Sequence, residues 1–548
     1  MSTPLRRLAS PALAVVLVAF SALASPWARP AAATGGGTFT INTSNDSNTP
    51  GDNELSLREA IEVADGSLLG PFSAAERAQM ANCTFDAGHN IGNSCGGGNN
   101  LIKFNPTLTE ARLTATLPTI TANGITVDGA VNSGQIVING QALAADAFDV
   151  SASQFTLRNA AVINLTGYAV WSNAAIKGLV LANDNLGVPP GAGSCSDPRL
   201  VQRNFTQVYL SGGAGTAAAG DGTAYLTDNV IGCSAHEAIV LSNVAYIYVG
   251  QARTGAPGRN WIGSDASGHD LGSVEWGILV CCSGLTHDVR VLGNVIAHSG
   301  WDGINLAQSP ANTFSGNVIA QSGWNGIDLA QSSSNMLSGN VLAGNGIAGV
   351  KLEDSDLTTL TDNDIYNNLS SGIWLTGTQT LTTTISGGAL HDNGAAGISE
   401  GNGATDNTWH RLSAYNNAGL GIDKNDNGLP DATDALAITS TVATSQGISV
   451  TGTITGTFLP VFYSYQVELY ALAPDPSGYG EGRRWIGATT IANNRTWSVL
   501  DPSRAGCYTA VVTLNGVNFL TGHNVSYEFA ANFGACIYDL NLPLVRRS

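Results

Sequence analysis

The most regular feature of the chain is a pattern of apolar and polar positions that repeats every 23 residues. Residues 293–315 read GNVIAHSGWDGINLAQSPANTFS, and the next two windows keep the same order of residue types. Within a copy, apolar residues such as Ile304 and Leu306 stand two apart, which places both side chains on one face of a strand. Gly, Asn and Ser between these pairs favour sharp turns. The copies, of which the last three are degenerate or partial, occupy residues 293–315, 316–338, 339–361, 362–386, 387–410 and 411–423.

One copy is too short for a helical repeat and lacks the 3.6-residue period. It accommodates about three short strands and three corners, which together make one coil of a parallel β-helix, with neighbouring coils about 4.8 Å apart. Equivalent residues of successive coils should therefore touch. Three inward columns are predicted: Ile296, Ile319, Leu342, Ile365 and Leu390; Ile304, Ile327, Val350, Ile373, Ile398 and Ile422; and Phe314, Leu337, Leu360, Ile385 and Trp409.

A fourth inward column is polar. It consists of Asn294, Asn317, Asn340 and Asn363. A buried amide without a partner is costly, so these side chains are expected to hydrogen-bond to neighbouring amides and to turn backbone.

The flanks of the repeats have other patterns. Weaker coils precede them, and we expect the solenoid over residues 100–436, with the Gly-rich segment 250–274 projecting from a corner as a loop. Residues 437–535 carry short runs of β-branched and aromatic residues, typical of a β-sandwich of immunoglobulin type. Residues 536–548 form an apolar and then basic tail, either a sorting or anchoring tail or a frayed terminus. The chain is therefore predicted to be all-β.

The N-terminus has the layout of an export signal. Arg6 and Arg7 precede a short apolar run over residues 12–24, which ends in a small-residue cleavage site at residues 22–24; residues 31–33 are a second candidate site. This run is too short to span a membrane, although an uncleaved anchor is the alternative interpretation. We assign residues 1–33 to a signal peptide and expect a secreted or cell-surface protein with no integral membrane span once the signal is removed.

Between the signal and the solenoid, residues 54–65 read ELSLREAIEVAD and predict a short amphipathic helix. Such a helix can cap the open end of a solenoid. The motif resembles the CSLREA domain of exported bacterial proteins that carry parallel β-helix repeats, with Leu55 where the family has Cys. The resemblance makes residues 34–99 an N-terminal cap region.

The repeats themselves resemble the right-handed β-helix family of pectin-lyase-like proteins. That resemblance implies the fold strongly and an activity weakly. The Asn-Thr-Asp and Gly-His-Gly motifs of polygalacturonases and the Asp-Pro-His motif of epimerases are missing from the sequence.

Composition and charge narrow the function classes. The 548 residues include 66 Gly, only 12% are charged, and the net charge is -18, which argues against a nucleic-acid-binding footprint and against a coiled coil. Eight cysteines in an exported chain permit disulfides. Cys83 with Cys95 and Cys507 with Cys536 would close short loops, and Cys195 could pair with Cys233, but the sequence leaves the connectivity open.

A polar stretch from residue 421 reads GIDKNDNGLPDATDAL, with Gly428 at a sharp turn. Its oxygen-bearing residues are Asp423, Asn425, Asn427, Asp431 and Asp434. This spacing is similar to the calcium loops of thrombospondin type 3 repeats and EF-hands, although Asp434 replaces a bidentate Glu. Structural Ca²⁺ is the only cofactor we expect, and a polar linker between domains is the alternative.

Candidate ligand-binding residues lie on one outward column and its adjoining corner. Trp301 and Trp324 are 23 residues apart and should stack on consecutive coils. The neighbouring residues are Asn305, Trp374, Asp302, Asp328 and Lys351. Exposed aromatic rings beside polar groups suit sugar binding, since a ring contacts the CH face of a sugar and polar groups bind its hydroxyls. The tryptophans and Asn305 are the predicted carbohydrate site.

The three charged residues of this group, Asp302, Asp328 and Lys351, are weak catalytic candidates for a β-elimination. Their alternative role is a solvated ion pair of little energetic weight. We expect a monomeric, non-catalytic scaffold or a protein that binds polysaccharide or cell-surface glycans. The alternatives are a polysaccharide lyase or hydrolase of the pectin-lyase-like type and an adhesin whose sandwich binds another protein.

Overall fold

The computed structural model describes residues 36–91, 95, 99–212, 222–282, 286–428, 436–454, 464–473, 481–492, 495–515 and 524–534. The predicted signal peptide (1–33) and tail (536–548) lie outside these residues, as do Asp431, Asp434 and Cys536. Among the described residues, none of the helices is both long and apolar enough to cross a bilayer.

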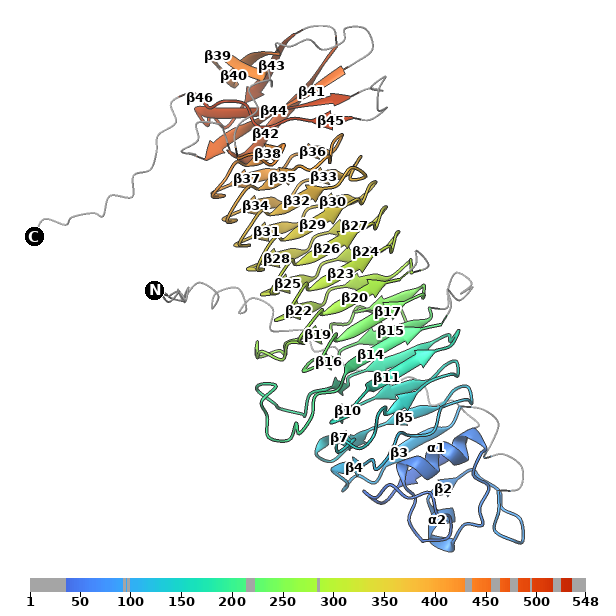
Figure 1. Cartoon of the computed structure of the whole chain (residues 1–548). Helices are drawn as coiled ribbons and strands as arrows, with labels where there is room; N and C mark the ends of the chain where they lie inside the picture. Colours follow the sequence, from blue (N-terminus) through green and yellow to red (C-terminus); the bar gives the residue numbers. More distant parts are fainter. Residues whose placement is uncertain are drawn as a thin grey trace, which may run out of the picture.

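The central part of the chain is a right-handed parallel β-helix built from three long sheets (Figure 1). Each coil adds one strand to each sheet, so neighbours in a sheet lie one coil apart in sequence. Parallel pairing holds throughout, except that β2 joins β1 and β6 joins β7 in antiparallel orientation.

Sheet 1 contains β2 (Met80–Ala81), β1 (Thr38–Ile41), β3 (Leu101–Phe104), β5 (Thr126–Asp128), β9 (Thr156–Arg158), β12 (Leu179–Ala182), β15 (Ala224–Thr227), β18 (Ile247–Val249), β21 (Arg290–Leu292), β24 (Thr313–Ser315), β27 (Met336–Ser338), β30 (Thr359–Thr361), β33 (Thr384–Ser386) and β36 (Thr408–His410). Sheet 2 contains β4 (Glu110–Arg112), β6 (Ala130–Val131), β7 (Gly134–Asn139), β10 (Ala160–Ile163), β13 (Asn185–Leu186), β16 (Val230–Ile231), β19 (Trp261–Ile262), β22 (Val295–Ala297), β25 (Val318–Ala320), β28 (Val341–Ala343), β31 (Asp364–Tyr366), β34 (Ala389–His391) and β37 (Ser413–Tyr415). Sheet 3 contains β8 (Phe148–Asp149), β11 (Tyr168–Asn173), β14 (Thr206–Ser211), β17 (Ile239–Ser242), β20 (Ile278–Cys281), β23 (Ile304–Ala307), β26 (Ile327–Ala330), β29 (Val350–Glu353), β32 (Ile373–Thr376), β35 (Ile398–Glu400) and β38 (Ile422–Lys424).

The register confirms the three predicted apolar columns. Ile304 pairs with Ile327 and Ile327 with Val350 in sheet 3, and the other two columns continue in the same way in sheets 1 and 2. All members are at most 2% exposed. Burying an aliphatic side chain of this size stabilises a fold by about 1.5–3 kcal/mol, so the columns form one continuous core along the axis.

The predicted amide column is also confirmed. Asn294 donates its side-chain amide to the Oδ1 of Asn317, which donates to Asn340, which donates to Asn363, over 2.9–3.2 Å. Each Oδ1 also accepts the backbone N–H of the preceding member, as between Asn317 and Asn294 (3.0 Å). A second amide ladder, which was not predicted, lies at another corner and consists of Asn345, Asn368, Asn393 and Asn417.

At the N-terminal end, two helices cover the solenoid: α1 (Leu57–Asp65) and α2 (Ala74–Ala78) (Figure 1). Ser56 and Glu59 form a capping box at the start of α1. Leu57 and Ile61 then pack into the solenoid core, while Arg58 forms an ion pair with Asp46 at 2.7 Å. The predicted helix therefore exists and seals the open end of the core.

A sandwich of two antiparallel sheets covers the other end. Sheet 4 contains β39 (Leu436–Thr444), β40 (Gly447–Ile454) and β43 (Thr496–Asp501), and sheet 5 contains β41 (Ser464–Ala473), β42 (Glu481–Ala492), β44 (Cys507–Asn515), β45 (Val525–Ser526) and β46 (Phe533–Gly534). Side chains from both sheets share one core. Tyr470 and Phe529 of the sandwich belong instead to the solenoid core, and the indole of Trp409 donates to the carbonyl of Tyr527 at 2.9 Å.

The expectation of a loop over residues 250–274 is wrong in part. Trp261 and Ile262 form β19, which bridges β16 and β22 and completes a coil in sheet 2. Only these two residues of the segment pair with the neighbouring strands. The Gly-rich residues around them conceal this short strand in the sequence.

The disulfides follow part of the prediction. Cys83 pairs with Cys95 and Cys195 with Cys233, and the adjacent residues Cys281 and Cys282 form a bond that the sequence analysis did not consider. Cys507 is also disulfide-bonded.

Candidate functional site

The site begins at the corner that precedes sheet 3, where neighbouring coils lie very close together. A Cβ on Gly323 would lie 2.0 Å from the carbonyl oxygen of Gly300, and Gly346 approaches Gly323 equally closely. Only glycine permits this approach. The residue after each glycine is thereby held at the surface, one above the other, and in two consecutive coils it is tryptophan: Trp301 and Trp324.

The two indoles stack as predicted. The rings of Trp301 and Trp324 are parallel within 5°, with centroids 5.1 Å apart. Trp276 meets Trp301 edge-on, at 84° and 4.5 Å, because it occupies the position of Asp302 rather than that of Trp301 in its own coil. The next position along the stack is Ile347, and Trp324 is 44% exposed. Trp301 covers one face of Trp324, and the exposed part of that indole is available to a ligand.

Beside this stack, the predicted outward column of sheet 3 is present. Asn305 pairs with Asp328, Asp328 with Lys351, and Lys351 with Trp374. The ammonium group of Lys351 lies 3.6 Å from Oδ2 of Asp328 and 2.6 Å from Oε2 of Glu353, and it sits over the Trp374 ring at 5.6 Å from the centroid. The structure thus unites the seven predicted residues into one surface, which we call the tryptophan face.

Asp302 holds neighbouring side chains of the tryptophan face in place through hydrogen bonds. It is 1% exposed, and its oxygens accept hydrogen bonds from the Trp276 indole (3.2 Å) and the Asn305 amide (3.1 Å). They also accept from the backbone N–H and the side-chain amide of Asn325, at 2.8 and 3.0 Å. With these four donors, the carboxylate orients Trp276 and joins three consecutive coils.

Asp328 differs from the solvated ion pair considered above. It is 8% exposed, and its Oδ1 is buried without a hydrogen-bond partner. Burial raises the pKa of Asp328 to about 6, the charge of Lys351 opposes this rise, and Asp302 and Glu353 add to it. For Lys351, burial lowers the pKa, but Glu353 and Asp328 outweigh burial and leave it raised. Asp328 is therefore a carboxyl group that can exchange a proton near neutral pH.

The predicted calcium loop is described only up to residue 428. Oδ1 of Asp423 accepts the backbone N–H of Asn427 at 3.3 Å, and Oδ2 accepts that of Gly428 at 2.9 Å. Asp423 is 5% exposed, and Asn425 and Asp426 take left-handed backbone conformations. Asp423 thus holds a tight turn.

A second aromatic stack, which was not predicted, lies on the outward face of sheet 2. Tyr366, His391 and Tyr415 lie in register with their rings parallel within 6° and centroids 4.8–5.0 Å apart. Burial lowers the pKa of His391, but Asp364 and Asp392 outweigh it and raise the pKa above 6.5. The signal was present in the sequence, because each ring follows an inward residue of one column directly.

Comparison with known proteins agrees with this architecture. Residues 276–430 match the family model described as a right handed beta helix region. The matched residues thus have the fold of a right-handed parallel β-helix. Among the curated proteins, none matches the sequence of this chain.

Three solved structures with similar folds share little sequence with this β-helix protein. The A-module of mannuronan C-5 epimerase AlgE4 from Azotobacter vinelandii is 14% identical, covers 60% of this chain and 79% of its own, and gives a TM-score of 0.35. A double mutant of the periplasmic alginate epimerase AlgG is 14% identical, covers 59% of this chain and 76% of its own, and gives 0.31. The enzymatically active domain of tailspike protein 2 from bacteriophage CBA120 is 10% identical, covers 80% of this chain and 73% of its own, and gives 0.32.

Proposed function

We propose that the protein binds polysaccharide on the tryptophan face without cleaving it. The observation that carries the proposal is the exposed indole of Trp324, which stacks on that of Trp301. A pyranose ring places its CH groups against such a surface, where aromatic stacking adds about 0.5–1.5 kcal/mol beyond the area buried.

Polar groups beside Trp324 supply directional contacts. The charged pair of Asp328 and Lys351 lies on two neighbouring strands of sheet 3, and Trp374 occupies the same position one coil beyond Lys351. Because coils are about 4.8 Å apart, a chain of sugars laid along the axis would meet this charged pair and a second indole within roughly 10 Å of Asp328. In keeping with the pattern of residues 1–33, we place this activity outside the cell.

A polysaccharide lyase or hydrolase is the second candidate, and the raised pKa of Asp328 favours it. A carboxyl group that exchanges a proton near neutral pH, beside the cationic Lys351, has the features of a general acid or base. The same geometry also serves binding, since a partly buried ion pair presents oriented donors and acceptors to sugar hydroxyls.

The two functions separate in one experiment. The full chain is run through native gels that contain neutral or uronic-acid polysaccharides, and the gels are also assayed for new reducing or unsaturated ends. Retention without products supports the proposal, and Trp324→Ala should weaken retention at least tenfold, about 1.4 kcal/mol.

Trp324→Phe keeps an aromatic ring and should retain part of the affinity, whereas Val318→Ala, at a 39% exposed position on sheet 2, should leave it unchanged. Products that form with the wild type and vanish with Asp328→Asn would establish the enzyme and refute the non-catalytic function. If Trp324→Ala retained the wild-type affinity for the polysaccharide, the binding site would lie outside the tryptophan face.

A further inference from the structure

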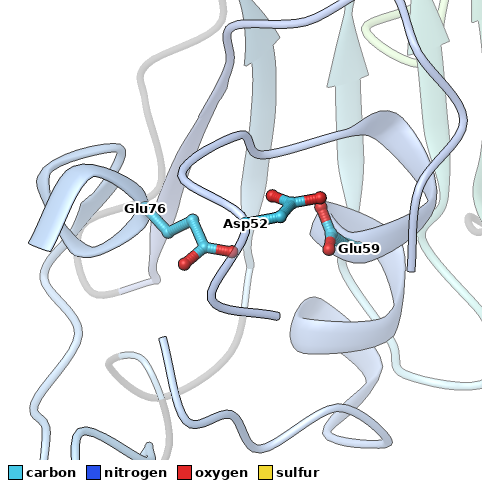
Figure 2. A group of neighbouring side chains, drawn as sticks. All are labelled: Asp52, Glu59 and Glu76. Atoms are coloured by element: carbon cyan, nitrogen blue, oxygen red, sulfur yellow. The ribbon is translucent and has the colours of Figure 1, made fainter. Parts of the chain in front are cut away.

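Three carboxylates meet in the N-terminal cap, far along the chain from the tryptophan face. Asp52 lies on the loop between β1 and α1, Glu59 is in the first turn of α1, and Glu76 is in the first turn of α2. One carboxylate oxygen of each residue lies within 4.8 Å of one from each of the others. Figure 2 shows Asp52 between the two glutamates, with the carboxylates of Asp52 and Glu59 turned toward each other.

The glutamates are fixed and buried. Both are 0% exposed. Oε2 of Glu59 accepts the backbone N–H of Ser56 at 2.9 Å, and both oxygens of Glu76 accept the N–H of Gly51 at 2.8 and 3.0 Å. These bonds hold the carboxylates in place whatever else binds them.

One oxygen in this group has no partner in the protein. Oε1 of Glu59 is buried and makes no hydrogen bond. Within the described residues, no Lys, Arg or His pairs with Asp52, Glu59 or Glu76, since the nearby cation Arg58 bonds to Asp46 and Arg77 bonds to His89. Two buried carboxylates and a third beside them therefore have only neutral donors to balance their charge.

We propose that Asp52, Glu59 and Glu76 form a calcium-binding site. Carboxylate oxygens are the ligands of hard cations, and the group contains no Cys or His that would favour zinc. Calcium tolerates irregular geometry with six to eight oxygens, whereas magnesium demands a near-ideal octahedron, and these carboxylates are already constrained by backbone bonds. The exposed Asp52 leaves room for water to complete the shell.

The electrostatics agree with this assignment. Burial, together with the smaller effects of the Asp52 and Glu76 charges, raises the pKa of Glu59 to about 7, against the bonds from Ser56. A divalent cation among the three oxygens reverses this penalty. It also ties α1, α2 and the loop before α1 together over the end of the solenoid core, so calcium should stabilise the cap.

The test uses Glu59→Gln in the full chain, because glutamine keeps an oxygen for the Ser56 N–H and removes only the charge. Calcium chloride is titrated calorimetrically into chelator-treated protein at slightly alkaline pH, and thermal unfolding is followed with calcium and with chelator. The wild type should bind calcium and melt higher with it. Glu59→Gln should bind on the order of tenfold more weakly or worse, since even second-shell partners of metals contribute tenfold or more.

The variant should also melt higher than the wild type in chelator, because a buried charge and its repulsion are gone. A variant that merely damages the fold would not melt higher than the wild type in chelator. Glu62→Gln, on the same helix and outside the cluster, is the matched control and should respond to calcium like the wild type.

Two results would overturn the proposal. In the first, calcium does not bind, and Glu59→Gln stabilises the protein equally with calcium and with chelator, so the three carboxyl groups merely share protons. In the second, Asp423→Asn abolishes the calcium response and Glu59→Gln does not, so the ion belongs to the loop after β38.

Discussion

Asn317→Ala is the sharpest test of the solenoid, because the amide column bonds each coil to the next. The side chain of Asn317 accepts from the backbone N–H of Asn294 at 3.0 Å and donates to the carbonyl of Val291 at 2.8 Å and to Asn340 at 3.0 Å. Alanine leaves the buried N–H of Asn294 without an acceptor, at about 1–3 kcal/mol. It also removes three further bonds at about 0.5–1.5 kcal/mol each, one of them from the side-chain amide of Asn294 at 3.2 Å. The free energy of unfolding should fall by about 2.5–7.5 kcal/mol.

The assay combines denaturant unfolding with hydrogen exchange read by mass spectrometry. Coils of a solenoid interact with their nearest neighbours, so exchange should accelerate first in the coils that contain β22 and β25. Val318→Ala, at the exposed neighbouring position, should change stability by less than about 0.5 kcal/mol. If Asn317→Ala were as stable as Val318→Ala, the amide column would contribute nothing, and the explanation of its burial would be wrong.

Three further predictions concern other parts of the molecule. The folded-state pKa of Asp328 is raised from 3.8 to about 6. Its contribution to stability is therefore fully present below about pH 4, and at most about 3 kcal/mol of it is lost as the pH rises to about 6. Urea unfolding across this range should show a flatter pH dependence for Asp328→Asn than for the wild type. His391 has a raised pKa, so it stabilises the fold below pH 6.5 and loses this effect as the pH rises through its folded value; an NMR titration that places its pKa at or below 6.5 would contradict the role of Asp364 and Asp392. Gly323→Ala forces a Cβ against the carbonyl of Gly300 and should lower stability by about 1–3 kcal/mol or more, seen as a lower melting temperature.

The strict 23-residue period explains how much could be predicted from the sequence. Once one coil is recognised, the period places Ile327 on Ile304, Asn317 on Asn294 and Trp324 on Trp301 without further information. The same reasoning could have found the ladder that starts at Asn345, since Asn368 follows 23 residues later and Asn393 and Asn417 keep the 25- and 24-residue lengths of the degenerate copies.

Features that break the period could not be predicted. Trp276 lies 25 residues before Trp301 and in a shifted position, so its edge-on contact depends on the length of one irregular coil. The burial of Asp302 depends on an amide from the following coil, at Asn325, which converts an apparent surface carboxylate into an internal link. The carboxylates of the cap are 7 and 17 residues apart in a segment without repeats, and only the folded loop brings them together.

The two ends of the solenoid show that its terminal domains belong to the same folding unit as the coils. A β-helix without caps exposes both strand edges and an apolar core. Here Glu468 of β41 accepts the backbone N–H of Arg411 at 2.7 Å, and Phe529 packs into the solenoid core next to Gly421. Deleting the sandwich would therefore expose the core of the last coils as well as remove a domain. A loss of adhesion in such a truncation would not show that the sandwich binds a partner, so its outward surface has to be tested by substitutions that leave the Phe529 contact intact.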